Sequence, residues 1–260
     1  MQCPRLTHFA RFNPNGTISR CGHMISPPQF QTLEEMENSS WLTEITTSLN
    51  SNQWPKECNR CQTSEEIGVK SIRQHAEDFD KLHSITRPDY LIIGGVLDNI
   101  CNSGCQTCMP SCSTKIGSLY SRQYPIVDNS KKFWGLPVDR IIELDINGGE
   151  PSASRNYLYL LKNLPDKVRY VRVNTNCSSV IPELRELTNK GVKVIVTVSF
   201  DGIGSVHDYV RWPIKWDNFQ KNLFEYQKMN LHELNLWTTV SALNINQLPE
   251  IITFAQEHKI

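Results

Sequence analysis

Three cysteines stand close together in the segment 98–110, at C-x3-C-x2-C spacing: Cys101, Cys105 and Cys108. They directly follow the apolar run 90–97. A closed tetrahedral zinc site needs four ligands, and no histidine follows at zinc-finger spacing to complete one. Three thiolates on one tight loop instead suit a cubane iron–sulfur cluster with one iron left open. The spacing therefore predicts a metal-binding loop, with a zinc loop that borrows a ligand from elsewhere as the alternative.

A glycine-rich turn further along the chain carries a single carboxylate, in the order Gly148-Gly149-Glu150-Pro151. It follows the apolar run 140–146, which we predict to be a strand. Two glycines let the backbone approach a ligand closely, and a carboxylate beside them accepts hydrogen bonds from an ammonium group. The simpler alternative is a strand-to-helix turn in which Pro151 starts the helix.

Four more cysteines lie in the first 75 residues, in two separated pairs: Cys3 with Cys21, and Cys58 with Cys61. Four thiolates complete either an iron–sulfur cubane or a zinc tetrahedron. The block has little apolar material for a core of its own, and small domains of this kind usually depend on a metal. We therefore expect a metal site here, with iron and zinc both open.

The two remaining cysteines are not expected to be ligands. Cys112 lies four residues after Cys108, where it is placed to close a four-cysteine cluster. A closed cluster would only transfer electrons and would leave the glycine–glutamate turn without a role, so we predict that Cys112 is not a ligand. Cys177 follows the third predicted strand and is expected to be a small buried hydrophobe.

The composition of this 260-residue chain is that of an ordinary globular protein, with 39% hydrophobic and 21% charged residues. Its length allows one or two domains with a large core. Lys+Arg and Asp+Glu both number 27, so the global basic field typical of nucleic-acid binding is absent. The sequence shows neither a signal peptide nor an apolar run of membrane-spanning length. Nine cysteines, an odd count without a secretory signal, argue against disulfides and favour a reducing cytoplasm.

From residue 89 onward, strands and helices are predicted to alternate. Strands are expected at 90–97, 140–146, 168–173, 192–200 and 235–241, and helices at 115–122, 157–164, 179–190, 216–229 and 247–258. In the third helix, Ser179 is the expected cap, Pro182 stands early and Gly191 closes the helix. Repeated strand–helix units imply a parallel α/β sheet with right-handed crossovers. Because such folds place their chemistry at the carboxyl ends of strands, the cysteine loop and the glycine-rich turn both fall where a site is expected.

The first block is predicted to contain a hairpin at 12–18, turned by Pro14-Asn15-Gly16, and a helix over 32–49. A charged helix over 67–84 is expected to connect this block to the alternating region. We therefore divide the chain into a cysteine-rich module at 1–75, a linker helix at 76–88 and an α/β domain at 89–260.

With the C-x3-C-x2-C loop after the first strand and Gly-Gly-Glu-Pro after the second, the chain resembles the radical S-adenosylmethionine superfamily, specifically over residues 90–211. That family's core is a partial parallel TIM-like barrel of six βα units. Five are visible here, so the resemblance implies a domain that is incomplete at its C-terminus or a sheet completed in another way. It also implies a 4Fe–4S cluster whose open iron binds S-adenosylmethionine. Reductive cleavage would then give a 5′-deoxyadenosyl radical that abstracts hydrogen from a substrate.

The resemblance further implies cofactor-binding residues at the strand ends. Gly148, Gly149, Glu150 and Pro151 would hold the amino group of S-adenosylmethionine. Asn174 would contact the ribose or the methionine carboxylate. Ser199 and Asp201 would contact the nucleoside, and Arg211 would lie near the methionine carboxylate. A turn cap is the alternative for Asn174, and a solvent-facing side chain is the alternative for Arg211. The chain departs from the family pattern at Cys177, which replaces a glycine, and at Met109, which replaces an aromatic residue.

Residues 1–62 resemble, more loosely, the auxiliary cluster module of twitch and SPASM radical S-adenosylmethionine proteins. The resemblance rests on Cys3, the Asn15-Gly16 turn, Cys21, the Trp41-Leu42 helix and the terminal pair Cys58 and Cys61. It implies a second 4Fe–4S cluster, with structural zinc as the alternative. The module departs from its relatives in preceding the barrel instead of following it.

We therefore expect a radical S-adenosylmethionine enzyme that modifies a peptide or protein, since families with such modules often do so, although some make small cofactors from nucleotides. An electron donor such as flavodoxin or ferredoxin is implied. The sequence assigns no catalytic residue. The alternative is a non-catalytic iron–sulfur or zinc-binding protein on a partial-barrel scaffold.

Overall fold

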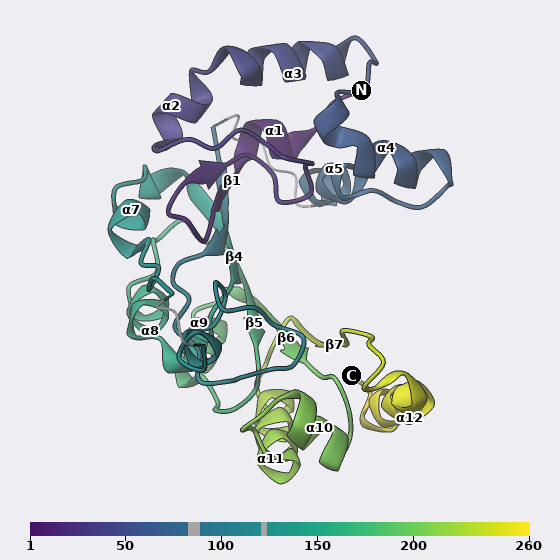
Figure 1. Ribbon diagram of the computed structural model, residues 1–260. Helices are drawn as coiled ribbons and strands as arrows, with labels where there is room; N and C mark the ends of the chain where they lie inside the picture. The colour runs from purple at the N-terminus through teal and green to yellow at the C-terminus, as the bar shows by residue number, and fades with distance from the viewer. Residues whose placement is uncertain (83–88, 121–123) are drawn as a thin grey trace.

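The computed structural model describes residues 1–82, 89–120 and 124–260. Within these ranges, seven strands form one sheet in the order β2-β1-β3-β4-β5-β6-β7 (Figure 1). The strands are β1 Phe9–Phe12, β2 Ile18–Ser19, β3 Leu91–Val96, β4 Ile141–Asn147, β5 Tyr170–Thr175, β6 Lys193–Ser199 and β7 Glu233–Trp237. All neighbours pair in parallel except β1 and β2. The predicted parallel α/β fold is confirmed, and its five predicted strands are all present with ends shifted by a few residues.

The N-terminal hairpin extends this sheet. β1 pairs in parallel with β3, with Phe9 opposite Ile92, and β2 folds back antiparallel to β1. The turn contains Gly16 at φ +81°, a backbone region that glycine enters without steric cost. The predicted hairpin is therefore confirmed. The five βα units gain a further parallel strand on the side of β3, from a part of the chain that precedes them.

One face of the sheet carries the main core. Alternate strand residues point to that face, as a two-residue period requires, and include Leu144, Ile146, Val171 and Val173. Four helices add apolar side chains to the same core: α8 Arg155–Lys162, α9 Pro182–Asn189, α11 Trp216–Gln227 and α12 Leu248–His258. These confirm four predicted helices, except that α9 begins at Pro182 and not at Ser179. Proline fixes φ and suits the first helical position, so it sets the start without a side-chain cap.

Among the N-terminal helices lies a second, smaller core built from Leu6, Met24, Ile45 and Leu49 with Cys21 and Cys58, whereas Leu33 and Met36 of this region pack into the main core. The helices are α1 Pro4–His8, α2 Leu33–Glu37, α3 Ser40–Asn50 and α4 Asn59–Glu66, with a 3-10 turn, η1, at Lys56–Cys58. The single helix predicted over 32–49 is wrong. Ser39 interrupts it, because its hydroxyl accepts from the Leu42 N–H and caps a new helix.

The helix predicted over 67–84 begins later than expected, since α5 spans Ile72–Leu82. The last part of the predicted linker, 83–88, lies outside the described residues. Of the helix predicted at 115–122, the structure shows the short α6 Thr114–Gly117, and residues 121 and 122 are also outside the described ranges.

Several short helices were not predicted: α7 Ser130–Trp134, α10 Ser205–Val210, and the 3-10 turns η2 Val138–Arg140, η3 Pro151–Ala153 and η4 Ile245–Gln247. Among the helices that the structure describes, none is long and apolar enough to cross a membrane.

Candidate functional site

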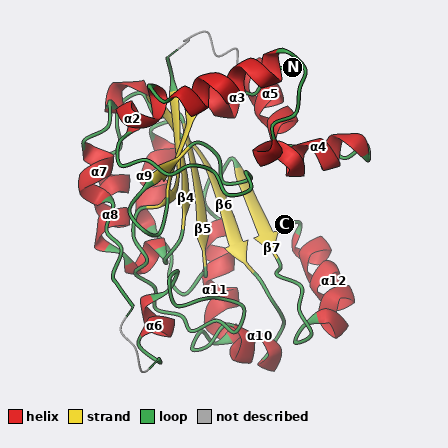
Figure 2. Cartoon of the chain, turned by 45° about the horizontal axis from the view of Figure 1, so that its top comes forward, coloured by secondary structure: helices red, strands yellow, loops and turns green. Residues whose placement is uncertain are grey.

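The C-x3-C-x2-C loop lies directly after β3, at the edge of the sheet where the parallel strands end. Figure 2 shows the arrowheads of the strands pointing towards α6 and α10 at this edge. Cys101 is half-buried, Cys105 is buried and Cys108 is exposed. The Cys101 N–H donates to the Thr114 hydroxyl at 3.1 Å, so the start of α6 holds the first cysteine.

The glycine-rich turn after β4 packs against this loop. The Glu150 N–H donates to the Ile100 carbonyl at 2.7 Å, one residue before Cys101. Gly149 has φ +60°, and a Cβ there would lie 2.6 Å from the Ile100 carbonyl oxygen and 2.9 Å from that of Asp98. Glycine is required here because the two backbones touch. The structure thus brings together the two segments that the sequence singled out.

The Glu150 carboxylate points into the protein, where the side chain is 1% exposed. It accepts hydrogen bonds from Ser152 N–H at 3.1 Å, Ser152 Oγ at 2.7 Å, Thr175 Oγ1 at 2.7 Å and Asn176 N–H at 2.6 Å. Burial raises the pKa of Glu150, while these bonds act to lower it. The carboxylate therefore fixes the turns after β4 and β5 relative to each other.

The turn after β5 also contacts the cysteine loop, through a residue that the sequence did not single out. Asn176 Nδ2 donates to Asn102 Oδ1 at 2.9 Å and to Ser103 Oγ at 2.7 Å. The predicted site residue Asn174 is exposed on the other face of β5, and its Nδ2 donates to Asn147 Oδ1. Asn174 lies within β5, whereas Asn176 follows Thr175, the last residue of the strand, and of the two it is Asn176 that contacts the cysteine loop.

The end of β6 supplies the next group of predicted residues. Ser199 is half-buried at the last position of β6. Asp201 is 0% exposed, accepts from the Thr239 N–H at 2.7 Å, and forms an ion pair with Arg211 Nε at 2.9 Å. The Arg211 side chain, 12% exposed, also donates from Nη1 to Cys105 Sγ at 3.3 Å. The solvent-facing alternative for Arg211 is therefore wrong.

Burial changes the acidity of the first and the third loop cysteine. Burial raises the pKa of Cys101, and burial with the neighbouring sulfurs raises the pKa of Cys108 to about 11. A metal must therefore displace protons to bind them. Among the described residues, no three His, Cys, Asp or Glu side chains are arranged to hold a single metal ion. In a cubane each thiolate binds a different iron, so three sulfurs spread along one loop are a suitable donor set.

Three of the four N-terminal cysteines belong to the second core, where Cys21 and Cys58 are buried and Cys3 packs against them. Cys61 lies near Cys3 and Cys21. Burial, with the neighbouring sulfurs, raises the pKa of Cys3 and of Cys58 to about 12. Cys3 precedes β1, and Cys21 follows the antiparallel β2, so both lie where the parallel strands begin. This edge is opposite the C-x3-C-x2-C loop, and a six-residue strand of roughly 20 Å separates the two edges.

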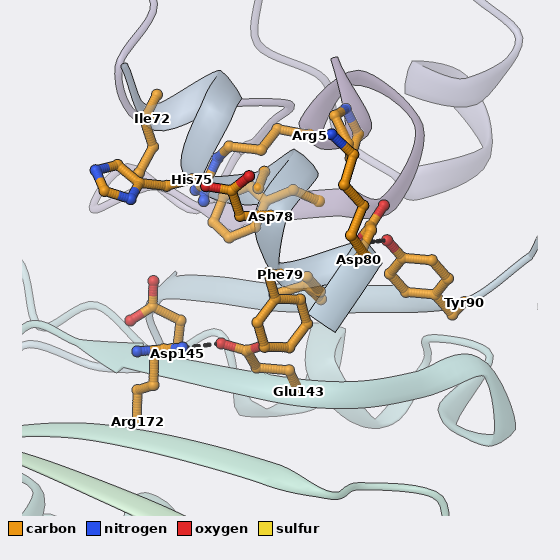
Figure 3. A pocket seen from close by; sticks show the side chains of 15 residues that line it. Arg5, Ile72, His75, Asp78, Phe79, Asp80, Tyr90, Glu143, Asp145 and Arg172 are labelled. Carbon is orange, nitrogen blue, oxygen red and sulfur yellow. Dashed lines mark hydrogen bonds and ion pairs between the residues drawn. The ribbon is translucent and has the colours of Figure 1, made fainter. Parts of the chain in front are cut away.

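A cavity of about 810 Å³ lies between α5, α1 and the face of the sheet opposite the main core (Figure 3). Its sheet wall is polar, with an ion pair of 2.6 Å between Arg172 Nε and the buried Glu143. Burial raises the pKa of Glu143, while Arg172 acts to lower it. Asp145, two residues further along β4, lines the same wall. The alternation of charged and apolar residues along 141–147 was the signal from which this polar face could have been found.

No family model matches the chain, and neither does any curated protein. The chain is similar to two crystal structures of SuiB from Streptococcus suis. With the structure bound to the precursor peptide SuiA, it shares 15% identity at a TM-score of 0.46, covering 78% of this chain and 51% of that one. With the structure bound to S-adenosylmethionine, it shares 18% identity at a TM-score of 0.46, covering 84% and 51%. The chain therefore spans about half the length of these structures.

Proposed function

We propose that the chain is a radical S-adenosylmethionine enzyme that modifies a peptide or protein. The observation that carries the proposal is the 2.7 Å bond from the Glu150 N–H to the Ile100 carbonyl. It places the Gly-Gly-Glu-Pro turn against the C-x3-C-x2-C loop, at the edge where parallel α/β folds bind their ligands.

Cys101, Cys105 and Cys108 would hold a 4Fe–4S cluster with one open iron. When bound, the cluster supplies the electron that cleaves S-adenosylmethionine to the 5′-deoxyadenosyl radical. The turn formed by Gly148, Gly149, Glu150 and Pro151 would position the methionine end. The buried Glu150 carboxylate contributes by fixing that turn, since its hydrogen bonds come from the chain itself. Ser199, at the end of β6, is our candidate for contact with the nucleoside.

The N-terminal cysteines would hold a second 4Fe–4S cluster, with zinc as the alternative. Their position at the opposite edge of the sheet favours a structural or electron-transfer role over direct contact with S-adenosylmethionine.

The proposed substrate class, a peptide or protein, rests on the resemblance of residues 1–62 to auxiliary modules. The polar cavity beside Glu143 and Asp145 is the place where we would look for the substrate. The proposal includes an electron donor such as flavodoxin or ferredoxin. It also includes a cytoplasmic location, because the nine free thiols suit a reducing compartment.

The test is production of 5′-deoxyadenosine from S-adenosylmethionine by the anaerobically reconstituted protein with dithionite. The parent should form it, and the variant Cys101→Ala/Cys105→Ala/Cys108→Ala should not. Cys112→Ala is the matched control, because it removes a neighbouring half-buried thiol that we predict is not a ligand, and it should retain activity.

The rival function is a non-catalytic iron–sulfur or zinc-binding protein. It would be favoured if the parent bound metal but left S-adenosylmethionine intact. Cleavage that persists in the triple variant would remove the loop from the proposed site.

A further inference from the structure

The cysteine loop is paired with the segment that follows α10. Backbone N–H groups on both sides of Cys105 donate to carbonyls on both sides of Arg211, so the two residues stand opposite each other. The donor–acceptor pairs are Gly104 with Trp212 at 2.7 Å and Gln106 with Val210 at 2.9 Å. The Trp212 ring covers the loop at Gly104, where an added Cβ would lie 3.0 Å from Trp212 Cε3. The backbone thus sets the register between Cys105 and Arg211.

The side chains use this register to connect a cysteine with a buried carboxylate. Arg211 Nη1 donates to Cys105 Sγ at 3.3 Å, and Arg211 Nε lies 2.9 Å from Asp201 Oδ2. Asp201 is in turn held by the Thr239 N–H at 2.7 Å, after β7. Because Cys105, Arg211 and Asp201 are largely buried, water screens the charges on Arg211 and Asp201 little.

We propose that Arg211 is a positioning residue that holds the Cys105 sulfur and sets the reduction potential of the cluster on the loop. The inference rests on the proposed function and adds a role for Arg211 beyond contact with S-adenosylmethionine. Reduction adds negative charge to a cluster, and a hydrogen-bond donor or a cation at a ligand sulfur stabilises that charge. Asp201 opposes the effect, since its carboxylate is paired with the same guanidinium.

The two partners therefore have opposite effects on the potential. Arg211→Met removes the cation and should shift the midpoint potential of the loop cluster to more negative values. Asp201→Asn removes the anion and should shift it to more positive values. The double variant removes both charges, avoids an unpaired buried Asp201, and should lie between the two. A role in shape alone would disturb the loop in the same way in both single variants, and so would not produce shifts of opposite sign.

The measurement is a redox titration of the reconstituted full chain without S-adenosylmethionine, followed by electron paramagnetic resonance. The electron paramagnetic resonance signal of the loop cluster, called the loop signal, is identified as the one that the triple cysteine variant lacks. Lys215→Met is the control, because it removes an exposed cation four residues away and should leave the potential unchanged.

An unchanged potential in Arg211→Met, with weaker binding of S-adenosylmethionine, would assign Arg211 to the methionine carboxylate alone and overturn the proposal. Shifts of the same sign in both single variants would also overturn it. A parent without any loop signal would instead overturn the proposed function, and this assignment with it.

Discussion

Three carboxylates follow three strands of the sheet and are buried beside the cysteine loop: Asp98 after β3, Glu150 after β4 and Asp201 after β6. Asp98 accepts from the Ile100 N–H at 3.0 Å and from Asn156 Nδ2 at 3.0 Å. Each carboxylate therefore joins its own turn to a different segment of the chain. Buried charges are tolerated when they are hydrogen-bonded, as in Asp98 and Glu150, or paired with an opposite charge, as in Asp201 with Arg211, so these residues hold the loops at this edge together.

Replacing Glu150 with glutamine tests this role. The amide would place an NH2 group opposite N–H or O–H donors that now face oxygen, leaving at least one buried donor unsatisfied. We expect Glu150→Gln to lower the free energy of unfolding by about 1–3 kcal/mol in urea denaturation. Binding of S-adenosylmethionine should weaken because the turn is less well fixed, with the iron content near that of the parent.

The matched control is Glu250→Gln, an exposed residue of α12, which should change stability by less than about 0.5 kcal/mol. Parent-like stability and parent-like binding in Glu150→Gln would contradict the positioning role.

At the scale of the elements, α10 contains a fully buried histidine one turn before Arg211. The His207 ring lies 4.4 Å from Phe219 and 5.5 Å from Trp216 between ring centroids. Burial, and to a lesser extent the cation of Arg211, lowers the pKa of His207 to about 4. The helix therefore packs on the core with a neutral imidazole.

This histidine predicts a loss of stability in acid. The unfolded chain takes up the proton below about pH 6.5, whereas the folded state does not until about pH 4, so stability falls between these values as the pH is lowered. At pH 5, about 1.5 pH units below the pKa of the unfolded state, the loss of stability is about 2 kcal/mol, since each pH unit contributes about 1.36 kcal/mol. His207→Phe should remove this part of the difference between urea denaturation at pH 7.5 and pH 5. The exposed His232→Gln should leave that difference unchanged.

The turn after β4 predicts a contrast between two glycines with positive φ. Gly191→Ala, at φ +83° with nothing within 4 Å of the added Cβ, should cost only the left-handed strain of about 1–2 kcal/mol. Gly149→Ala meets the Ile100 carbonyl as well and should cost roughly twice as much, because backbone must move. Thermal unfolding of the two variants measures the difference. Equal losses would mean that the turn is not docked on the loop.

The sequence predicted the elements and motifs whose signals are local. The spacing of the loop cysteines and the period of the strands lie within a few residues, so they can be found without a structure. The partners of Glu150, which are Ser152, Thr175 and Asn176, depend on β5 being the neighbour of β4. The pairing of β1 with β3 joins segments about 80 residues apart, and no local pattern specifies it. For the same reason, the contact between Arg211 and Cys105 required the fold.

At the scale of the whole molecule, the two sets of cysteines lie at opposite edges of the sheet. Three of the four N-terminal cysteines, Cys3, Cys21 and Cys58, belong to the second core, whereas all three loop cysteines follow β3. Because the two cysteine sites lie at different edges of the sheet and in different parts of the core, we expect each site to bind its metal independently of the other.

This separation predicts how iron is distributed. Two cubanes correspond to about eight irons per chain, and replacement of Cys3, Cys21, Cys58 and Cys61 by serine should leave about four. The triple loop variant should also retain about four. Iron and zinc analysis of the reconstituted proteins measures both. One cubane together with stoichiometric zinc in the parent would show that the N-terminal site binds zinc, and would leave the loop site intact.

The order of strands in the sheet also bears on how the protein forms during synthesis. From β4 to β7, each strand lies beside the one that precedes it in the chain, and β3 joins β1 of a hairpin that is complete before β3 is made. A ribosome adds residues from the N-terminus, so each new strand can join an existing edge without waiting for a distant segment. The cysteine loop follows β3, the third strand to be made, whereas its partner Arg211 emerges more than 100 residues later, after β6. The loop is thus synthesised early, but it acquires its arginine only when most of the sheet has formed.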